Sequence, residues 1–456
     1  MDADVLVIGS GQAGVPLASR LAGAGKRVIL VERKELGGTC VNVGCTPTKT
    51  MVASARAAHV ARTAGRLGVH AKEVRVDFPA VVDRKDAIVR SWRKGVEDRL
   101  KKGGDRMVLV RGHARFVGPR RVEVGGEIHS AQTVIINTGA RGVEPPVDGL
   151  KSVPWLHNGT LMELRELPAH LVVLGGGYIG CEFAQMFRRF GARITIVDRA
   201  EHLLSREDPD ISVEVENAFR EEGIELRQRV KVARVAGKQG DVTVHLEGGG
   251  EVRGSHLLVA VGRRPNTDDL GCDKGGIELD EGGAIRVDDR YRTTAEGTYA
   301  VGDVTGGPQF THTSWDDHRI LFDILMGKGK RGRDGRHIPY TVFTDPQVAG
   351  VGLTEREARK KGIKFEIASM DFGDIARAWE VDERRGRCKI LLDPESERIL
   401  GVFVCGAEAG ELIHIFVPLL QAGAKATAIV DAEFVHPTFS EGMQSLVMRL
   451  ERYALS

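Results

Sequence analysis

The stretch "ADVLVIGSGQAGVPLASRLAGAGKRVILVER" (residues 3–33) decides the fold. An apolar run is followed by a glycine turn, a helix-forming segment and a second apolar run that ends in Glu32. The turn contains Gly9, Gly11 and Gly14. In this pattern the first glycine makes a tight turn, the second lets the backbone approach a pyrophosphate, and the third lets helix and strand pack closely. The pyrophosphate lies at the helix N-terminus and the acid binds a ribose, so the stretch predicts a dinucleotide site.

The same pattern returns in "AHLVVLGGGYIGCEFAQMFRRFGARITIVDR" (residues 169–199), with Gly175, Gly177 and Gly180 in the turn and Asp198 as the acid. In both copies the acid follows the first glycine by 23 residues. A single glycine turn is weak evidence, but two copies with equal spacing predict two Rossmann-type dinucleotide-binding domains. FAD and a nicotinamide nucleotide are the natural pair, because hydride passes readily between them.

Composition excludes several other classes of protein. The chain has 456 residues, which suggests about three domains, and a net charge of +2 gives no electrostatic case for a nucleic acid or membrane partner. The N-terminal sequence lacks a basic, apolar leader, and no apolar run is long enough to span a bilayer. Six cysteines in a chain of this length do not make a disulfide framework, so we expect a cytoplasmic protein.

Two cysteines, Cys40 and Cys45, stand close together in "GGTCVNVGCTPTKT" (residues 37–50). The segment that follows is rich in helix formers, so we expect a helix to begin near Cys45, where a helix N-terminus favours a thiolate. Three interpretations compete: a zinc site, inert buried cysteines, or a redox-active disulfide beside a flavin. Zinc needs about four ligands, usually in two close pairs. The remaining cysteines are isolated in the sequence, namely Cys181, Cys272, Cys388 and Cys405.

Short motifs follow one another in a fixed order along the chain. They are GSGQAG, GGTCVNVGC, NTGA (137–140), GGGYIG with CEFA, VAVGRRPN (259–266), YAVGDV (299–304), TDPQVAGVGLTE (344–355) and HPTFSE (436–441). From end to end the series resembles the flavoprotein disulfide oxidoreductases, the family of dihydrolipoamide dehydrogenase, glutathione reductase and mercuric reductase. The resemblance implies an α/β fold with two Rossmann-type domains, a C-terminal α+β dimerisation domain, and a homodimeric enzyme that uses FAD and NAD(P)H.

The resemblance also implies roles for single residues. Cys40 would be the thiol that attacks a substrate disulfide, and Cys45 would be the charge-transfer thiol against the flavin, the two forming a redox-active disulfide. His436 would be the base that activates Cys40 of the other subunit, with Glu441 orienting its imidazole, because a thiol needs a base to become a nucleophile. Without the resemblance, a histidine before a proline is more often structural.

Further contacts to the cofactors follow from the same motifs. Lys49 and Glu182 resemble an ion pair beneath the flavin, and Asp303 resembles the acid that binds the ribityl chain. Tyr178 matches a ring that covers the nicotinamide pocket, although it could instead pack in the core. The other predicted cofactor contacts are Thr39, Thr138, Gly139 and Gly262.

The residue that ends the second pattern bears on the choice of nucleotide. An acid at Asp198 favours free ribose hydroxyls and so NADH, whereas Arg199 and the nearby Arg206 leave NADPH open. His312, in "FTHTSWDDH", and the basic segment 326–339 are interpreted as structural, the latter as a solvated linker.

We expect four segments. Residues 1–149 form the first part of the FAD-binding domain, with the cysteine helix, and residues 150–262 form the NAD(P)-binding domain. Residues 263–335 return to the FAD-binding domain, and residues 336–456 form the dimerisation domain.

The substrate is the least determined feature. His436 and Asp198 favour a disulfide substrate and a dihydrolipoamide dehydrogenase-like activity. The alternative is mercuric-reductase-like reduction of Hg(II) or Cu(II), supported by "HLLSREDPDIS" but not by the C-terminus "SLVMRLERYALS", which lacks the cysteine pair of mercuric reductases. A flavoprotein that serves only as a binding subunit would have lost a catalytic element, and none is missing.

Overall fold

The computed structural model describes residues 2–453, which form two compact units. The first unit comprises residues 2–51, 80–143 and 262–336, and the second comprises residues 52–79, 144–261 and 337–453. Within residues 2–453, no helix is both long and apolar enough to cross a membrane.

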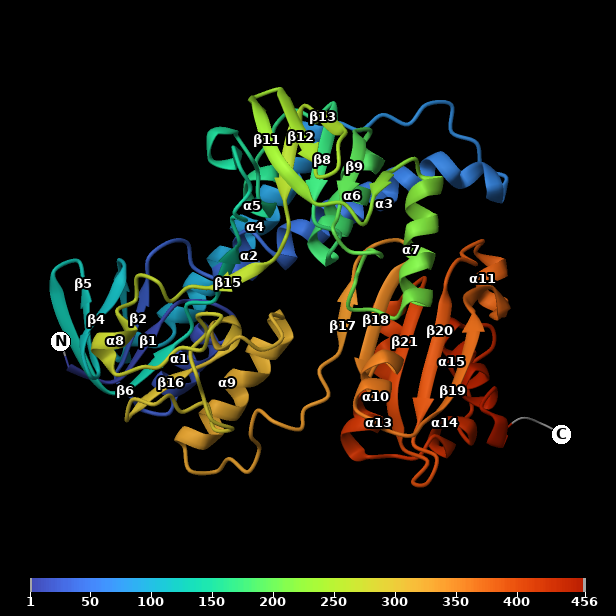
Figure 1. Cartoon of the computed structure of the whole chain (residues 1–456). Helices are drawn as coiled ribbons and strands as arrows, with labels where there is room; N and C mark the ends of the chain where they lie inside the picture. The colour runs from blue at the N-terminus through green and yellow to red at the C-terminus, as the bar shows by residue number, and fades with distance from the viewer. Residues whose placement is uncertain (1, 454–456) are drawn as a thin grey trace. The chain divides into compact units, whose positions relative to one another are not determined.

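The first unit contains the first predicted nucleotide-binding pattern. β1 (Asp2–Ile8), α1 (Gly14–Gly23) and β2 (Val28–Glu32) confirm the predicted strand, helix and strand. β1 pairs in parallel with β2 and β6 in a sheet of order β3-β2-β1-β6-β5-β4, with β16 also pairing with β6 (Figure 1). The other strands are β3 (Met107–Arg111), β4 (Ala114–Gly118), β5 (Arg121–Val124), β6 (Glu127–Ile136) and β16 (Thr298–Ala300), with a separate pair of β7 (Ala140–Gly142) and β15 (Arg263–Pro265).

The helices of this unit position the cysteine segment. Its short elements are α2 (Gly38–Asn42), α8 (Cys272–Gly275) and the 3-10 turn η4 (Gly302–Thr305). α9 (Thr311–Leu325) packs on α1, and their apolar residues share one core with β1 and β2. α3 (Cys45–Thr63) begins at Cys45, as the sequence predicts, and α4 (Phe78–Lys101) is the next long helix in the chain.

The second unit begins with a parallel sheet of order β10-β9-β8-β14. β8 (His170–Leu174), α6 (Tyr178–Phe190) and β9 (Arg193–Val197) confirm the second predicted pattern. The sheet is completed by β10 (Glu225–Arg227) and β14 (His256–Val259), and the neighbouring elements are α5 (Asn158–Leu161), α7 (Pro209–Glu221) and the antiparallel strands β11 (Val232–Lys238), β12 (Asp241–Leu246) and β13 (Glu251–Gly254).

The second unit ends in an α+β domain, drawn in orange and red in Figure 1. Its antiparallel sheet has the order β17-β18-β21-β20-β19 and shares a core with α15 (Phe439–Met448). The strands are β17 (Tyr340–Val342), β18 (Gln347–Gly352), β19 (Glu366–Asp371), β20 (Arg387–Leu392) and β21 (Ile399–Gly406). The other helices are α10 (Glu355–Lys360), α11 (Ala376–Glu380), α12 (Ala409–Leu412), α13 (Phe416–Ala422) and α14 (Thr427–Val430).

Candidate active site

The first glycine turn is closed by contacts that leave no room for side chains. A Cβ on Gly14 would lie 2.0 Å from the Gly9 carbonyl oxygen, so the start of α1 requires glycine. The Gly14 N–H donates to Oδ1 of Asn137 at 2.9 Å, and Glu32 accepts from the backbone N–H and the hydroxyl of Ser10 at 2.9 and 2.6 Å. These contacts fix the backbone of the turn at the N-terminus of α1 and fix the Glu32 carboxylate beside it. A pyrophosphate requires such a helix N-terminus, and a ribose requires such an acid. Asn137 lies in the NTGA motif, but sequence reasoning did not single it out.

The second turn repeats this construction in the second unit. A Cβ on Gly180 would lie 1.9 Å from the Gly175 carbonyl oxygen, whereas a Cβ on Gly177 would meet no atom within 4 Å. Open space at the middle glycine fits the approach of a dinucleotide. Asp198 accepts hydrogen bonds from the backbone N–H groups of Gly176 and, at 2.6 Å, Ala200.

Two predicted residues flank the second turn. Tyr178, the first residue of α6, is 37% exposed. Arg199, next to Asp198, is exposed. Both are therefore accessible at the turn where we expect the nicotinamide nucleotide.

The cysteine segment lies directly against the first glycine turn. Gly38, with φ of 63°, is so close to it that a Cβ would lie 2.7 Å from the Gly11 Cα. Gly44 separates α2, which carries Cys40, from α3, which begins at Cys45, and a Cβ there would lie 3.2 Å from the Cys40 Cα. Because Gly38 and Gly44 carry no side chain, the chain can approach the turn closely, and both cysteines lie beside the turn and beside each other.

The two sulfurs differ in their surroundings. A hydrogen bond with Cys45 and burial raise the pKa of Cys40, although hydrogen bonds with Thr311 and Thr46 act in the opposite direction. Cys45 is exposed, and its Sγ lies 3.2 Å from Oγ1 of Thr311. Sequence reasoning interpreted the neighbouring His312 as structural and did not single out Thr311, because no local pattern joins residues that stand 266 positions apart.

The other four cysteines, Cys181, Cys272, Cys388 and Cys405, are buried. Within residues 2–453 no group of three or more His, Cys, Asp and Glu side chains could hold a metal ion. Thr39 lies in α2 next to Cys40 and is exposed.

The remaining predicted flavin contacts of the first unit lie on loops and short turns. Asp303, in η4, pairs with Arg263 at 2.9 Å, and burial raises its pKa although Arg263 lowers it. The Thr138 hydroxyl donates to the Asn266 carbonyl at 2.9 Å, and Gly139 has a φ of 67°. Gly262 accepts from the Val143 N–H at 3.0 Å.

Lys49 and Glu182 belong to different units, so their pairing stays a prediction. Lys49 is half-buried in α3. Glu182 is buried in α6, and its Oε1 accepts from the Phe343 N–H at 2.9 Å.

The exposed His436 pairs with the half-buried Glu441 in the α+β domain. The His436 Nδ1 lies 2.9 Å from each carboxylate oxygen, and the His436 side chain is 71% exposed. Glu441 is fixed in turn because its N–H donates to the hydroxyl of Thr438, the residue before α15, at 3.2 Å. The neighbouring Val435 is 75% exposed. The carboxylate thus holds one ring nitrogen and leaves the other free to act as a base.

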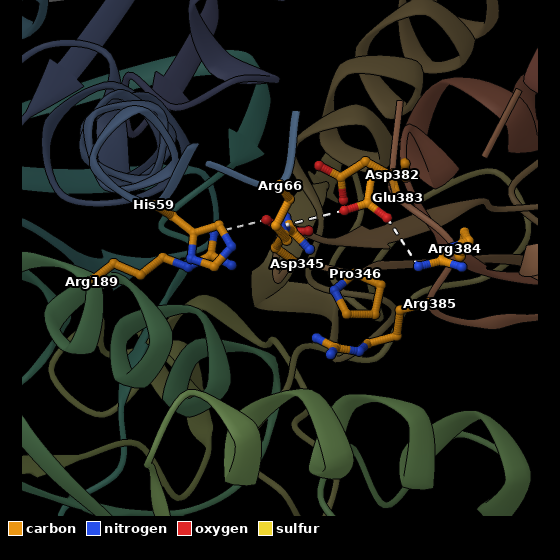
Figure 2. Close-up of a pocket in the computed structure, with 10 residues that line it drawn as sticks. His59, Arg66, Arg189, Asp345, Pro346, Asp382, Glu383, Arg384 and Arg385 are labelled. Atoms are coloured by element: carbon orange, nitrogen blue, oxygen red, sulfur yellow. Dashed lines mark hydrogen bonds and ion pairs between the residues drawn. The ribbon is translucent and has the colours of Figure 1, made fainter. Parts of the chain in front are cut away.

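A charged cavity of about 160 Å³ lies elsewhere in the second unit (Figure 2). Four arginines line it, and each has a carboxylate partner. The buried Arg189 binds Asp345 at 2.8 Å and Glu222 at 2.7 Å. Burial raises the pKa of Asp345, but Arg189 and Arg56 lower it below its usual value. None of the predicted site residues lines this cavity. Its charged side chains belong to an ion-pair network that joins α3, α6 and the α+β domain.

Comparisons with known proteins identify the family. Residues 3–317 match the pyridine nucleotide-disulphide oxidoreductase model, and residues 338–447 match the dimerisation domain of the same family. The chain is 38% identical to the probable pyridine nucleotide-disulfide oxidoreductase RclA of Escherichia coli, with 97% of this chain and 98% of that protein covered. It is 36% identical to dihydrolipoyl dehydrogenase of Thermus scotoductus (99% and 98% covered) and 34% identical to mercuric reductase of Lysinibacillus sphaericus (98% and 83% covered).

A solved structure agrees with these relatives. The Cu(II) complex of the HOCl-induced flavoprotein disulfide reductase RclA from Escherichia coli superposes with a TM-score of 0.90 at 36% identity, covering 98% of this chain and 99% of the other. The two Rossmann-type patterns and the α+β domain confirm the fold class that the sequence predicts. The chain therefore belongs to the pyridine nucleotide-disulphide oxidoreductase family, whose members are flavoprotein enzymes that bind FAD and use NAD(P)H.

Proposed function

We propose that this enzyme moves electrons between a nicotinamide nucleotide and a dithiol or disulfide substrate through a Cys40–Cys45 redox disulfide, in the manner of dihydrolipoamide dehydrogenase. The observation that carries the proposal is the placement of the cysteine pair against the first glycine turn, where Gly38 touches Gly11. The two thiols are hydrogen-bonded to each other, so their sulfurs lie close enough for a disulfide to form between them. The acid at Asp198 favours NADH as the nucleotide.

The thiol chemistry follows from the two sulfurs. In the reduced pair, Cys40 attacks one sulfur of the substrate disulfide, which breaks that bond and forms a mixed disulfide. Cys45 then attacks the Cys40 sulfur and releases the second substrate thiol, so the substrate is reduced and the cysteine pair is oxidised. When bound, FAD supplies the electron pair from NAD(P)H that returns the cysteine pair to the dithiol.

His436 is proposed as the base for these steps. Its free ring nitrogen takes the proton of Cys40 and later gives a proton to the departing substrate thiolate. The high exposure of His436 and Val435 in a single chain and the match to a dimerisation domain support a homodimer in which the imidazole serves the partner's cysteine pair.

Reduction of a metal ion is the second candidate function. The RclA structure is named as a Cu(II) complex, a relative is named mercuric reductase, and Cys45 is exposed. A dithiol carries two electrons, enough to reduce two Cu(II) ions to Cu(I) or one Hg(II) ion to the metal. Metal reduction requires no proton transfer to a leaving thiolate, so His436 would be dispensable.

Anaerobic titration of the FAD-loaded enzyme with one equivalent of NADH tests the proposal. We expect a long-wavelength absorption band from a thiolate against the flavin, its loss in Cys45→Ser and its persistence in the control Cys272→Ser, a buried cysteine outside the site. Turnover should then be measured with lipoamide, glutathione disulfide, Hg(II) and Cu(II). If His436→Ala preserves disulfide turnover and impairs metal reduction, the ranking of the two functions is wrong. Protein that binds no flavin and oxidises no NADH would refute both.

A further inference from the structure

Residues 199–208 connect the predicted ribose acid Asp198 to α7, and they pack on the second glycine turn. The Leu204 N–H donates to the Gly176 carbonyl oxygen at 2.8 Å, and a Cβ on Gly176 would lie 2.4 Å from Cδ2 of Leu203. Both leucines are buried. In a Rossmann-type unit the residues after the acid border the pocket for the adenosine ribose. The position of this segment therefore sets the space that a nicotinamide nucleotide has beside the turn.

The segment is not held in this position by local backbone preference. Leu204 has a φ of 49°, in the left-handed region that a leucine rarely adopts. A residue keeps such a conformation only where the surrounding contacts impose it, and such residues cluster at binding sites. One of these contacts is the hydrogen bond from the Leu203 N–H to a carboxylate oxygen of Glu216, at 3.0 Å. Further contacts come from the α+β domain.

Helix α10 of the α+β domain binds the far end of the segment. The guanidinium of Arg356 donates to the carbonyl oxygens of Ser205, at 3.0 Å, and Arg206, at 2.7 Å. In the opposite direction, the carboxylate of Asp208 accepts from the backbone N–H groups of Glu355 and Arg356, each at 3.1 Å. Asp208 directly precedes α7, yet its carboxylate is directed to α10. Arg356 thus contacts the segment through both its backbone and its side chain.

We propose that Arg356 is a positioning residue for the nicotinamide nucleotide, because it holds residues 199–208 against the second glycine turn. The inference rests on the proposed function for the placement of the nucleotide at that turn. Arg356 is an exposed residue, so its replacement should not prevent folding. It acts through the segment and not on the nucleotide. Its loss should therefore weaken the binding of the adenosine half and leave hydride transfer from bound NADH unchanged.

Anaerobic stopped-flow reduction of the FAD-loaded enzyme measures both quantities. The dependence of the rate on NADH concentration gives the dissociation constant of NADH and the limiting rate constant of flavin reduction. Arg356→Met keeps an apolar side chain but removes the donors to Ser205 and Arg206. It should raise the dissociation constant by about tenfold, which corresponds to the loss of one charge-assisted hydrogen bond, with the limiting rate constant unchanged.

Arg359→Met is the matched control. Arg359 lies in the same helix, but its side chain is 67% exposed and pairs with Glu355 of that helix at 2.6 Å. This variant should bind NADH as the native enzyme does. An equal loss of affinity in Arg359→Met and Arg356→Met would show that any loss of charge on α10 has this effect, and the proposal would fail.

Reduced nicotinamide mononucleotide separates positioning from a general disturbance of the domain, because it carries the hydride but lacks the adenosine half. It should reduce the FAD of the native enzyme and of Arg356→Met at equal rates. An unchanged dissociation constant of NADH in Arg356→Met would overturn the proposal. An equal slowing with NADH and with the mononucleotide would overturn it too.

Gly177→Val distinguishes this inference from the function on which it rests. A Cβ at this position meets no atom of the described residues within 4 Å, but the side chain would occupy the space for the pyrophosphate and should abolish NADH binding. If Gly177→Val binds NADH as the native enzyme does, the nucleotide lies elsewhere and the inference fails with its premise. If Gly177→Val loses NADH binding but Arg356→Met does not, the nucleotide remains assigned to the second turn and the role of Arg356 is refuted. The long-wavelength band in Cys45→Ser tests the cysteine pair independently of both outcomes.

Discussion

Glu207 is a buried carboxyl group whose replacement by glutamine should stabilise the protein above neutral pH and have a much smaller effect in acid. It is 6% exposed and accepts a hydrogen bond from the hydroxyl of Tyr340, a residue of the α+β domain. Burial raises its pKa to about 7, because the ionised form loses its water and the single hydroxyl does not replace it.

The size of the effect follows from the pKa values of the folded and unfolded states. At a pH below the unfolded-state pKa of 4.5, Glu207 is protonated in both the folded and the unfolded state, so it does not lower the free energy of unfolding. As the pH rises from there to about 7, the unfolded chain ionises first, so the folded state loses stability, and above that range the loss is constant. The loss is about 1 kcal/mol at pH 5 and about 3 kcal/mol at pH 8, using ~1.4 kcal/mol for each pH unit.

Urea unfolding of the native chain and of Glu207→Gln at pH 5 and pH 8 measures this difference. Any change in packing caused by the substitution affects both pH values equally, so the variant should gain about 2 kcal/mol more at pH 8 than at pH 5. Glu395→Gln, at an exposed glutamate, is the control and should show no such difference. An equal effect of Glu207→Gln at the two pH values would refute the reasoning.

Three further predictions concern the cysteine pair, the ion-pair network and the base. In Gly44→Val a Cβ would lie 2.8 Å from the Thr39 carbonyl oxygen and push the cysteines apart, so thiol titration of the oxidised protein should find both free; a retained disulfide would contradict this. Asp345→Asn weakens the ion pair of the buried Arg189 and should lower the free energy of unfolding by about 2–4 kcal/mol, and a loss under about 0.5 kcal/mol would show that the network contributes little. Glu441→Gln should slow disulfide turnover by about 10–100-fold while stopped-flow reduction of FAD by NADH stays unchanged, and slower flavin reduction would place the residue elsewhere in the mechanism.

Much of the candidate site could be predicted because its requirements are local. The glycines of both turns, Glu32 and Asp198 follow from the spacing of a strand, a turn and a helix, and the structure places them there. The start of α3 at Cys45 also follows from helix formers and the glycine before them. Such features depend on a few consecutive residues whose backbone conformation admits few alternatives.

Other features were missed because their partners are distant in the sequence. Asn137 binds Gly14 across 123 positions, and nothing in the NTGA motif indicates this contact. The basic segment 326–339 is interpreted from the sequence as a solvated linker, yet the side chain of Arg336 is only 11% exposed and pairs with Asp317 at 2.9 Å. Asp317 also accepts from the Gly302 N–H at 2.8 Å and so supports the turn that carries Asp303.

The sequence by itself determined the two nucleotide-binding patterns, the cysteine pair and, through its motifs, the family. Only the tertiary structure decided that the hydroxyl of Thr311 lies beside the cysteine pair, because α9 packs against α1 and the sheet and so brings Thr311 to Cys45. Strand order and helix packing follow from burial summed over a whole core, and no short pattern encodes that sum.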